Sequence, residues 1–87
     1  MTQPAIVMYV TGWCPYCQRV RSLFTKKGLG FTEIDVDDGG KVREEMIARS
    51  GRRTVPQIFI GDKHVGGCDD LFALDGSGEL DRLIQGA

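Results

Sequence analysis

A change of hydrophobic period near residue 14 constrains the fold of this chain more than any other feature of its sequence. Residues 5–10 form a short continuous apolar run, which is typical of a buried strand. From Cys17 onward the apolar residues recur at helical spacing, and Pro15 stands where a helix would begin. A strand therefore passes directly into a helix, and the motif Cys14-Pro15-Tyr16-Cys17 occupies the junction.

The periodicity of the remaining chain predicts the other elements. They are a helix over 15–27, a strand over 31–36, a helix over 41–50, strands over 57–60 and 64–65, a helix N-capped by Asp69, and a last amphipathic segment over 80–84. The first two strands are joined through a helix, so we expect them to pair in parallel, while the last two form an antiparallel hairpin. These pieces predict an α/β fold, a four-stranded mixed sheet with helices on both faces.

Length and charge limit the classes of function. The 87 residues allow one domain over residues 1–87, and a net charge of -1 argues against a strongly basic nucleic-acid-binding surface. No apolar stretch approaches the ~20 residues that span a bilayer, and the N-terminus lacks the pattern of a secretory signal. We therefore expect a cytoplasmic protein with no membrane partner. Three cysteines are too few for a disulfide-stapled secreted scaffold, so a close pair suggests catalysis or metal binding.

The position of the cysteine pair predicts its chemistry. Pro15 at the first helical position places Cys14 at the N-cap, where free backbone N–H groups and the positive end of the helix dipole face its sulfur. Both favour the thiolate, which is the attacking form of a cysteine. Cys17 follows one turn later on the same side, more enclosed and close enough for a disulfide. The spacing predicts that one cysteine attacks and the other resolves.

A zinc site is the competing interpretation of the pair. His64 and Cys68 would complete a Cys3His ligand set in that case. However, the sequence contains no second close cysteine pair, and Pro15 commits the first pair to a helix start. We therefore favour a thiol–disulfide centre, expect no metal ligands, and expect His64 to be solvated beside the hairpin turn with no chemical role.

Two further segments, residues 54–56 and 66–70, suggest a peptide-like ligand. The first is Thr-Val-Pro directly before an apolar strand, and the residues leave open whether its proline bond is cis or trans. The second has two glycines that allow close backbone approach, and a helix start whose N–H groups suit a carboxylate. The two aspartates of this segment could bind the ammonium group of a ligand. The alternative is that they only cap the helix. Glutathione is a small peptide with an amino group, two carboxylates and a thiol, so it is a ligand that suits both segments.

With these three motifs in this order, the chain resembles the glutaredoxin family, in its dithiol Cys-Pro-Tyr-Cys class of the bacterial glutaredoxin 3 type. The resemblance covers about Ile6 to Ile84 and includes residues 14–17, Arg-Thr-Val-Pro-Gln-Ile-Phe-Ile at 53–60 and Gly-Gly-Cys-Asp-Asp-Leu at 66–71. It implies a thioredoxin-like fold and a cis bond before Pro56. It also implies glutathione-coupled reduction of protein disulfides and glutathione mixed disulfides.

The resemblance also implies residue roles. Cys14 is implied as the nucleophile and Cys17 as the resolving thiol, with glutathione as reducing co-substrate and no permanently bound cofactor. The implied glutathione contacts are Thr11, Tyr16, Arg53, Thr54, Val55, Pro56, Gly67, Cys68 and Asp69. Many relatives carry a lysine where this chain has Thr11. Our hypothesis is that Arg53, together with Arg52, supplies the missing positive charge.

Two neighbours of this site have smaller expected roles. Trp13 is expected to shield its rim, and the thiol of Cys68 is expected to pack as a small apolar group.

The implied partners are glutathione and disulfide-containing or glutathionylated proteins, with the chain acting as a monomer and binding no nucleic acid. An alternative function is a glutathione-ligated iron–sulfur cluster carrier, a dimer that would hold the cluster through Cys14. Pro15 disfavours it, because cluster-binding relatives more often carry a smaller residue there. A thioredoxin-like protein reduced by a flavoprotein is a third possibility, but it leaves the glutathione contacts without a use.

Overall fold

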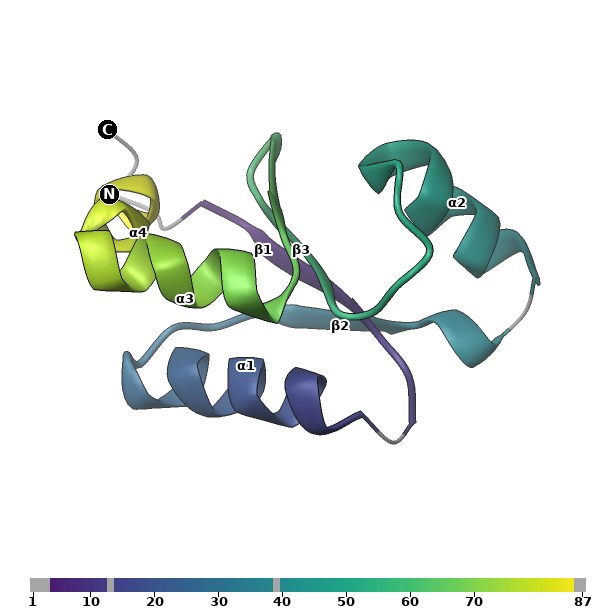
Figure 1. The fold of residues 1–87 in the computed structure, drawn as a ribbon, viewed down its shortest axis with the longest axis horizontal. Coiled ribbons are helices and arrows are strands. Elements are labelled where there is room, and N and C mark those ends of the chain that lie inside the picture. The colour runs from purple at the N-terminus through teal and green to yellow at the C-terminus, as the bar shows by residue number, and fades with distance from the viewer. Residues whose placement is uncertain (1–3, 13, 39, 86–87) are drawn as a thin grey trace.

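Four strands form a single sheet in the order β2-β1-β3-β4 in the computed structural model, which describes residues 4–12, 14–38 and 40–85 (Figure 1). The strands are β1 Ile6–Val10, β2 Thr32–Asp35, β3 Gln57–Ile60 and β4 Lys63–Gly66. The helices are α1 Pro15–Lys26, α2 Gly40–Ser50, α3 Cys68–Ser77 and α4 Glu79–Ile84, and a 3-10 turn, η1, covers Val36–Asp38.

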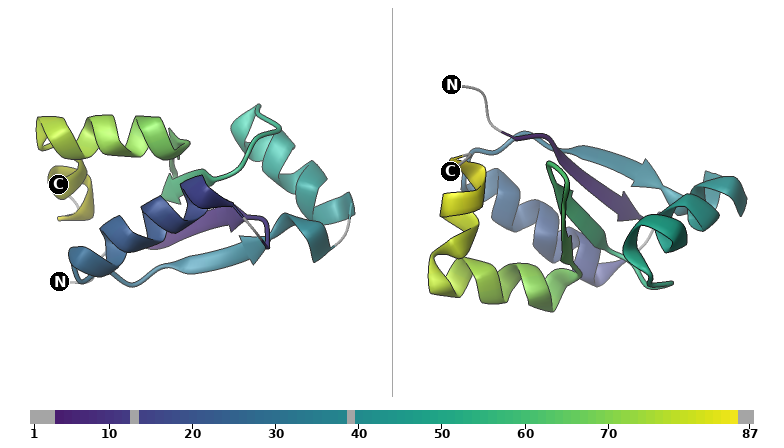
Figure 2. Two further views of the ribbon diagram at one scale, coloured as in Figure 1. Left: turned by 60° about the horizontal axis from the view of Figure 1, so that its bottom comes forward. Right: turned by 90° about the horizontal axis from the view of Figure 1, so that it is seen from above.

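The pairing of the strands confirms the predicted mixed sheet. β1 runs parallel to β2 and antiparallel to β3, and β3 pairs antiparallel with β4. Because successive side chains of a strand point to opposite faces, Met8 and Tyr9 enter different layers. Met8 belongs to a buried cluster that includes side chains of α1, α3 and α4, whereas Tyr9 belongs to a second cluster that includes Met46 of α2. Figure 2 shows α2 on the opposite side of the sheet from α1 and α3, so helices cover both faces as expected.

The predicted N-cap of α3 is wrong. The helix begins at Cys68 with Gly67 as its N-cap, not at Asp69. The reason is local: Asp70 is the third helical residue, and its Oδ2 reaches back to accept the N–H of Gly67 at 2.9 Å. β4 also extends beyond the two residues predicted for it.

The helices that the structure describes include none that is both long enough and apolar enough to cross a bilayer.

Candidate functional site

The cysteine motif lies where β1 passes into α1, as its spacing predicts. Cys14 is the N-cap of α1 with an extended backbone, and Pro15 is the first helical residue. The N–H of Cys17 donates to the Sγ of Cys14 at 3.2 Å. Pro15 has no N–H to offer, so this contact uses one of the free donors of the first turn. The sulfur of Cys14 therefore faces the positive end of a helix, as expected from the sequence.

The two cysteines differ in their access to solvent. Cys14 retains 7% of its surface exposed, and Cys17 is fully enclosed. Burial, followed by its hydrogen bond with Cys14, raises the pKa of the Cys17 thiol to about 12. A backbone hydrogen bond from Thr11 opposes this shift but does not cancel it. Cys17 is thus held as a protonated thiol behind the more accessible sulfur.

A cavity of about 200 Å³ opens beside the start of α1. Its lining comes from α1, from the segment before β3 and from the start of α3: Tyr16, Arg52, Thr54, Val55, Pro56, Gly67, Cys68, Asp69 and Asp70. The peptide bond between Val55 and Pro56 is cis, which confirms what the family resemblance implies. A Cβ on Gly67 would lie 3.4 Å from the carbonyl oxygen of Pro56, so the two segments approach closely where a glycine stands.

Most residues expected to contact glutathione meet at this cavity, and two do not line it. Among the described residues, Thr11 and Arg53 are absent from the lining. Arg53 is exposed, and its carbonyl oxygen accepts a hydrogen bond from Arg43 Nη1 at 3.4 Å. Trp13, which is expected to shield the rim of the site, lies outside the described residues.

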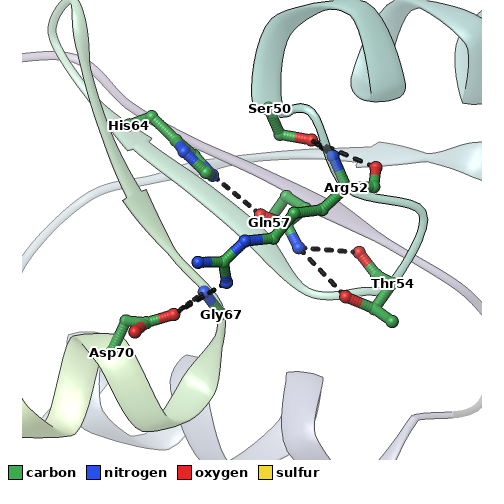
Figure 3. A network of polar contacts seen from close by, with 7 residues as sticks. All are labelled: Ser50, Arg52, Thr54, Gln57, His64, Gly67 and Asp70. Atoms are coloured by element: carbon green, nitrogen blue, oxygen red, sulfur yellow. Dashed lines mark hydrogen bonds and ion pairs between the residues drawn. The ribbon is translucent and has the colours of Figure 1, made fainter.

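The cation at the cavity is Arg52, which pairs with Asp70. Its Nη1 lies 3.0 Å from Asp70 Oδ2 (Figure 3). The backbone N–H of Gly67 and then the Arg52 guanidinium lower the pKa of the Asp70 carboxyl group. Asp70 therefore carries its charge at neutral pH and joins the segment before β3 to the start of α3.

Cys68 is a buried residue of the cavity lining. It also belongs to the buried cluster that contains Cys14 and Leu71. Burial raises the pKa of its thiol. This placement is that of a small apolar side chain, as expected.

The expectation that His64 is solvated is wrong. Its ring is half-buried, lies 4.9 Å from the ring of Phe59, and places Nε2 2.8 Å from Gln57 Oε1. Gln57 is itself fully buried and donates to Thr54 at the cavity (Figure 3). The one available signal was a glutamine opening the otherwise apolar run of β3, because a buried amide must find partners.

Metal ligands do not cluster in residues 4–12, 14–38 and 40–85, where no group of three His, Cys, Asp or Glu side chains is placed to hold an ion. The zinc set considered from the sequence would need His64, whose Nε2 already contacts Gln57.

Known proteins with similar sequences and structures are glutaredoxins. The Glutaredoxin family model matches residues 6–65 of this chain. Glutaredoxin 3 of Escherichia coli K12 is 52% identical over 80 residues, which cover 92% of this chain and 96% of that protein. The solution structure of a Brucella melitensis glutaredoxin is 49% identical, with a TM-score of 0.85 over 97% of this chain and 91% of that one. The crystal structure of a buckwheat glutaredoxin–glutathione complex is 35% identical, with a TM-score of 0.86 over 95% of this chain and 77% of that one. The mixed sheet and its helices are thus a thioredoxin-like fold.

Proposed function

This chain belongs to the glutaredoxin family, whose members are glutathione-dependent thiol oxidoreductases, and from this premise we propose how its residues carry out the reaction. The protein is a thiol–disulfide oxidoreductase that works through a cysteine pair. In our proposal Cys14 is the nucleophile and Cys17 the resolving thiol. The observation that carries it is the capping geometry, in which the more accessible sulfur faces the first turn of α1 and the enclosed one lies behind it.

The proposed reduction of a protein disulfide takes two exchange steps. The Cys14 thiolate attacks one sulfur of the substrate, forms a mixed disulfide, and releases the other sulfur as a thiolate. Cys17 then gives up its proton, attacks the sulfur of Cys14, and releases the reduced substrate while the Cys14–Cys17 disulfide forms. The raised pKa of Cys17 makes its deprotonation the demanding part of the second step.

Two molecules of glutathione close the cycle. The thiolate of the first attacks the Cys14–Cys17 disulfide, forms a mixed disulfide with Cys14, and returns Cys17 to its thiol. The thiolate of the second attacks the glutathione sulfur of that mixed disulfide and leaves glutathione disulfide and reduced Cys14. A glutathionylated protein enters the same cycle directly, because Cys14 alone can accept its glutathionyl group.

We place glutathione in the cavity beside α1. Tyr16 would flank its sulfur, and the backbone of Val55 would pair with its peptide, with Thr54 and Pro56 forming the same wall. Gly67, Cys68 and Asp69 would hold the γ-glutamyl end. All seven of these residues line the cavity, which supports the assignment.

The glycyl carboxylate of glutathione needs a cation. We retain Arg53 and Thr11 as proposed contacts that lie outside the lining, while Arg52 is the cation that stands at the cavity itself.

We further infer that the substrates are disulfide-containing and glutathionylated proteins, and that the chain acts as a cytoplasmic monomer without a permanent cofactor. Its near-neutral net charge of -1 supports a protein that binds neither nucleic acid nor membrane surfaces.

Glutathione-coupled assays of the two cysteine variants test this assignment. Cys14→Ser should abolish both disulfide reduction and deglutathionylation. Cys17→Ser should lose reduction of protein disulfides but retain deglutathionylation, since that path needs Cys14 alone. The two substitutions are matched, because each replaces one sulfur of the same motif by an oxygen. Substantial activity in purified Cys14→Ser would refute the assignment of the nucleophile.

A further inference from the structure

The buried amide of Gln57 connects β4 to the wall of the cavity. Its Nε2 lies 3.0 Å from the carbonyl oxygen of Thr54 and 3.2 Å from Thr54 Oγ1. Its Oε1 lies 2.8 Å from His64 Nε2. Figure 3 shows the three side chains in a line that leads from the hairpin to the segment before β3.

The chemistry of these partners determines which atoms carry the protons. The carbonyl oxygen of Thr54 only accepts hydrogen bonds, so the atom of Gln57 that faces it must be the NH2 group. The other end of the amide, which faces His64, is then the oxygen. An oxygen needs a donor, and His64 therefore carries its proton on Nε2.

The surroundings of His64 favour its neutral form. Burial and then the charge of Arg52 lower the pKa of His64, against the opposite effect of Asp70. On the sheet side the ring lies against Phe59, and the guanidinium of Arg49 lies 4.2 Å from the centroid of the Phe59 ring. A neutral imidazole has one N–H, and the line of contacts requires it at Nε2.

We propose that His64 is a positioning residue for the oxidoreductase reaction: its Nε2–H orients the Gln57 amide, which holds Thr54 and with it the Thr54-Val55-Pro56 wall of the glutathione cavity. This inference rests on the proposed placement of glutathione. Without the donor at Nε2, the Gln57 oxygen would be buried unpaired and would turn toward the Thr54 hydroxyl, which can donate, so that the NH2 group would no longer hold the Thr54 carbonyl oxygen. The wall would then lose its anchor in β3.

The kinetic test compares three variants of the full chain with a glutathionylated peptide as substrate. His64→Leu removes the donor, and His64→Gln restores an N–H of similar reach. Lys63→Leu, at an exposed neighbouring position of the same hairpin, is the matched control. His64→Leu should raise KM about fivefold, as expected for one lost hydrogen bond, with kcat within about twofold of wild type. His64→Gln and Lys63→Leu should both remain near the wild-type KM.

Several kinetic results would overturn the proposal. An unchanged KM in His64→Leu shows that the donor has no role. An equal rise in KM in His64→Leu and His64→Gln would assign the effect to packing of the imidazole ring on Phe59 instead. A fall in kcat without a rise in KM would place His64 in the chemistry rather than in positioning.

A spectroscopic readout separates this proposal from the proposed function. The side-chain NH2 protons of Gln57 should exchange slowly with solvent in the NMR spectra of the wild type and His64→Gln, and rapidly in His64→Leu. This measurement needs no glutathione. If the wild type shows no glutathione-dependent turnover, the proposed function fails, while the exchange of these protons still decides whether His64 orients the amide.

Discussion

At the junction of β1 and α1, Cys14 and Cys17 stand one helical turn apart in different surroundings. The N-cap position of Cys14 follows from Pro15, and the sequence therefore predicted it. The enclosure of Cys17 depends on side chains distant in the sequence, since the buried cluster around it includes Ile58 of β3 and Leu71 of α3. This difference supports the roles proposed for Cys14 as the attacking sulfur and for Cys17 as the resolving one.

Alkylation should distinguish the two sulfurs. An acid whose pKa is raised stays protonated at pH values where an ordinary thiol has ionised, and the pKa of Cys17 rises from 9.0 to about 12. At about pH 9, Cys17 should therefore react with iodoacetamide far more slowly than Cys14, whose sulfur is the more accessible of the two. Cys17 should stay slow in Cys14→Ser, because burial is the largest cause of the shift. Mass spectrometry of the labelled peptides measures the extent of modification at Cys14 and at Cys17.

The urea-unfolded chain is the control for this experiment, since all of its thiols are exposed. If Cys17 in the folded protein reacted at about pH 9 as fast as it does in urea, its burial would have no protective effect and the assignment of the resolving thiol would lose its basis.

At the scale of elements, the turn from β4 into α3 requires glycine at one position in particular. Gly66 has φ of 116°, where a side chain is strained, and a Cβ there would meet the carboxylate of Asp70. The same carboxylate accepts the N–H of Gly67 and pairs with Arg52. This glycine therefore allows α3 to begin at Cys68 and to face the cavity.

Gly66→Ala should lower the free energy of unfolding by about 1–3 kcal/mol, the usual cost of a side chain in a disfavoured backbone conformation. Urea denaturation measures it. The matched control is Gly76→Ala in α3, where a Cβ would meet nothing within 4 Å. That substitution should raise the free energy of unfolding by about 0.5–1 kcal/mol, because alanine favours the helix. Equal midpoints for the two variants would contradict the role given to Gly66.

The sequence predicted the type of strands β1 to β4 and of helices α1 to α3 better than it predicted the contacts at their ends, and it placed Val36 in a strand although this residue begins η1. It placed α1 correctly because proline marks a first turn, but it assigned the N-cap of α3 to Asp69 rather than Gly67. Asp70 lies inside the first turn of α3, and its carboxylate reaches back to the N-cap residue. The sequence alone does not distinguish such an aspartate from one that is itself the N-cap. His64 was misjudged for a related reason, since its partner Gln57 lies across a hairpin.

At the scale of the whole molecule, the sheet separates two buried clusters. One lies under α1, α3 and α4 and includes Leu71, and the other lies under α2 and includes Met46. Both side chains are fully buried. A domain of this size has a small margin of stability, so each cluster contributes a large fraction of it.

Leu71→Ala and Met46→Ala should each lower the free energy of unfolding by about 2–5 kcal/mol, because each leaves a cavity in a closed cluster. Glu44→Ala, on the exposed side of α2, should change it by less than about 0.5 kcal/mol. The urea midpoints of the three variants measure these differences. If Met46→Ala resembled Glu44→Ala, packing of α2 would not contribute to the stability of the sheet.

Hydrophobic period and proline position were enough to determine the order of elements, the mixed sheet, and the cysteine pair at a helix N-terminus. The order of elements and the place of the cysteine pair are local properties, set by residues within a turn or a strand of one another, and the mixed sheet follows from how the strands are connected. The three motifs were also enough to identify the family. The tertiary structure alone decided that Arg52, not Arg53, stands at the cavity, that Asp70 joins two segments, and that His64 and Gln57 stand behind Thr54. Such pairings join residues on different elements, so they depend on how β3, β4 and α3 pack rather than on the sequence of any one of them.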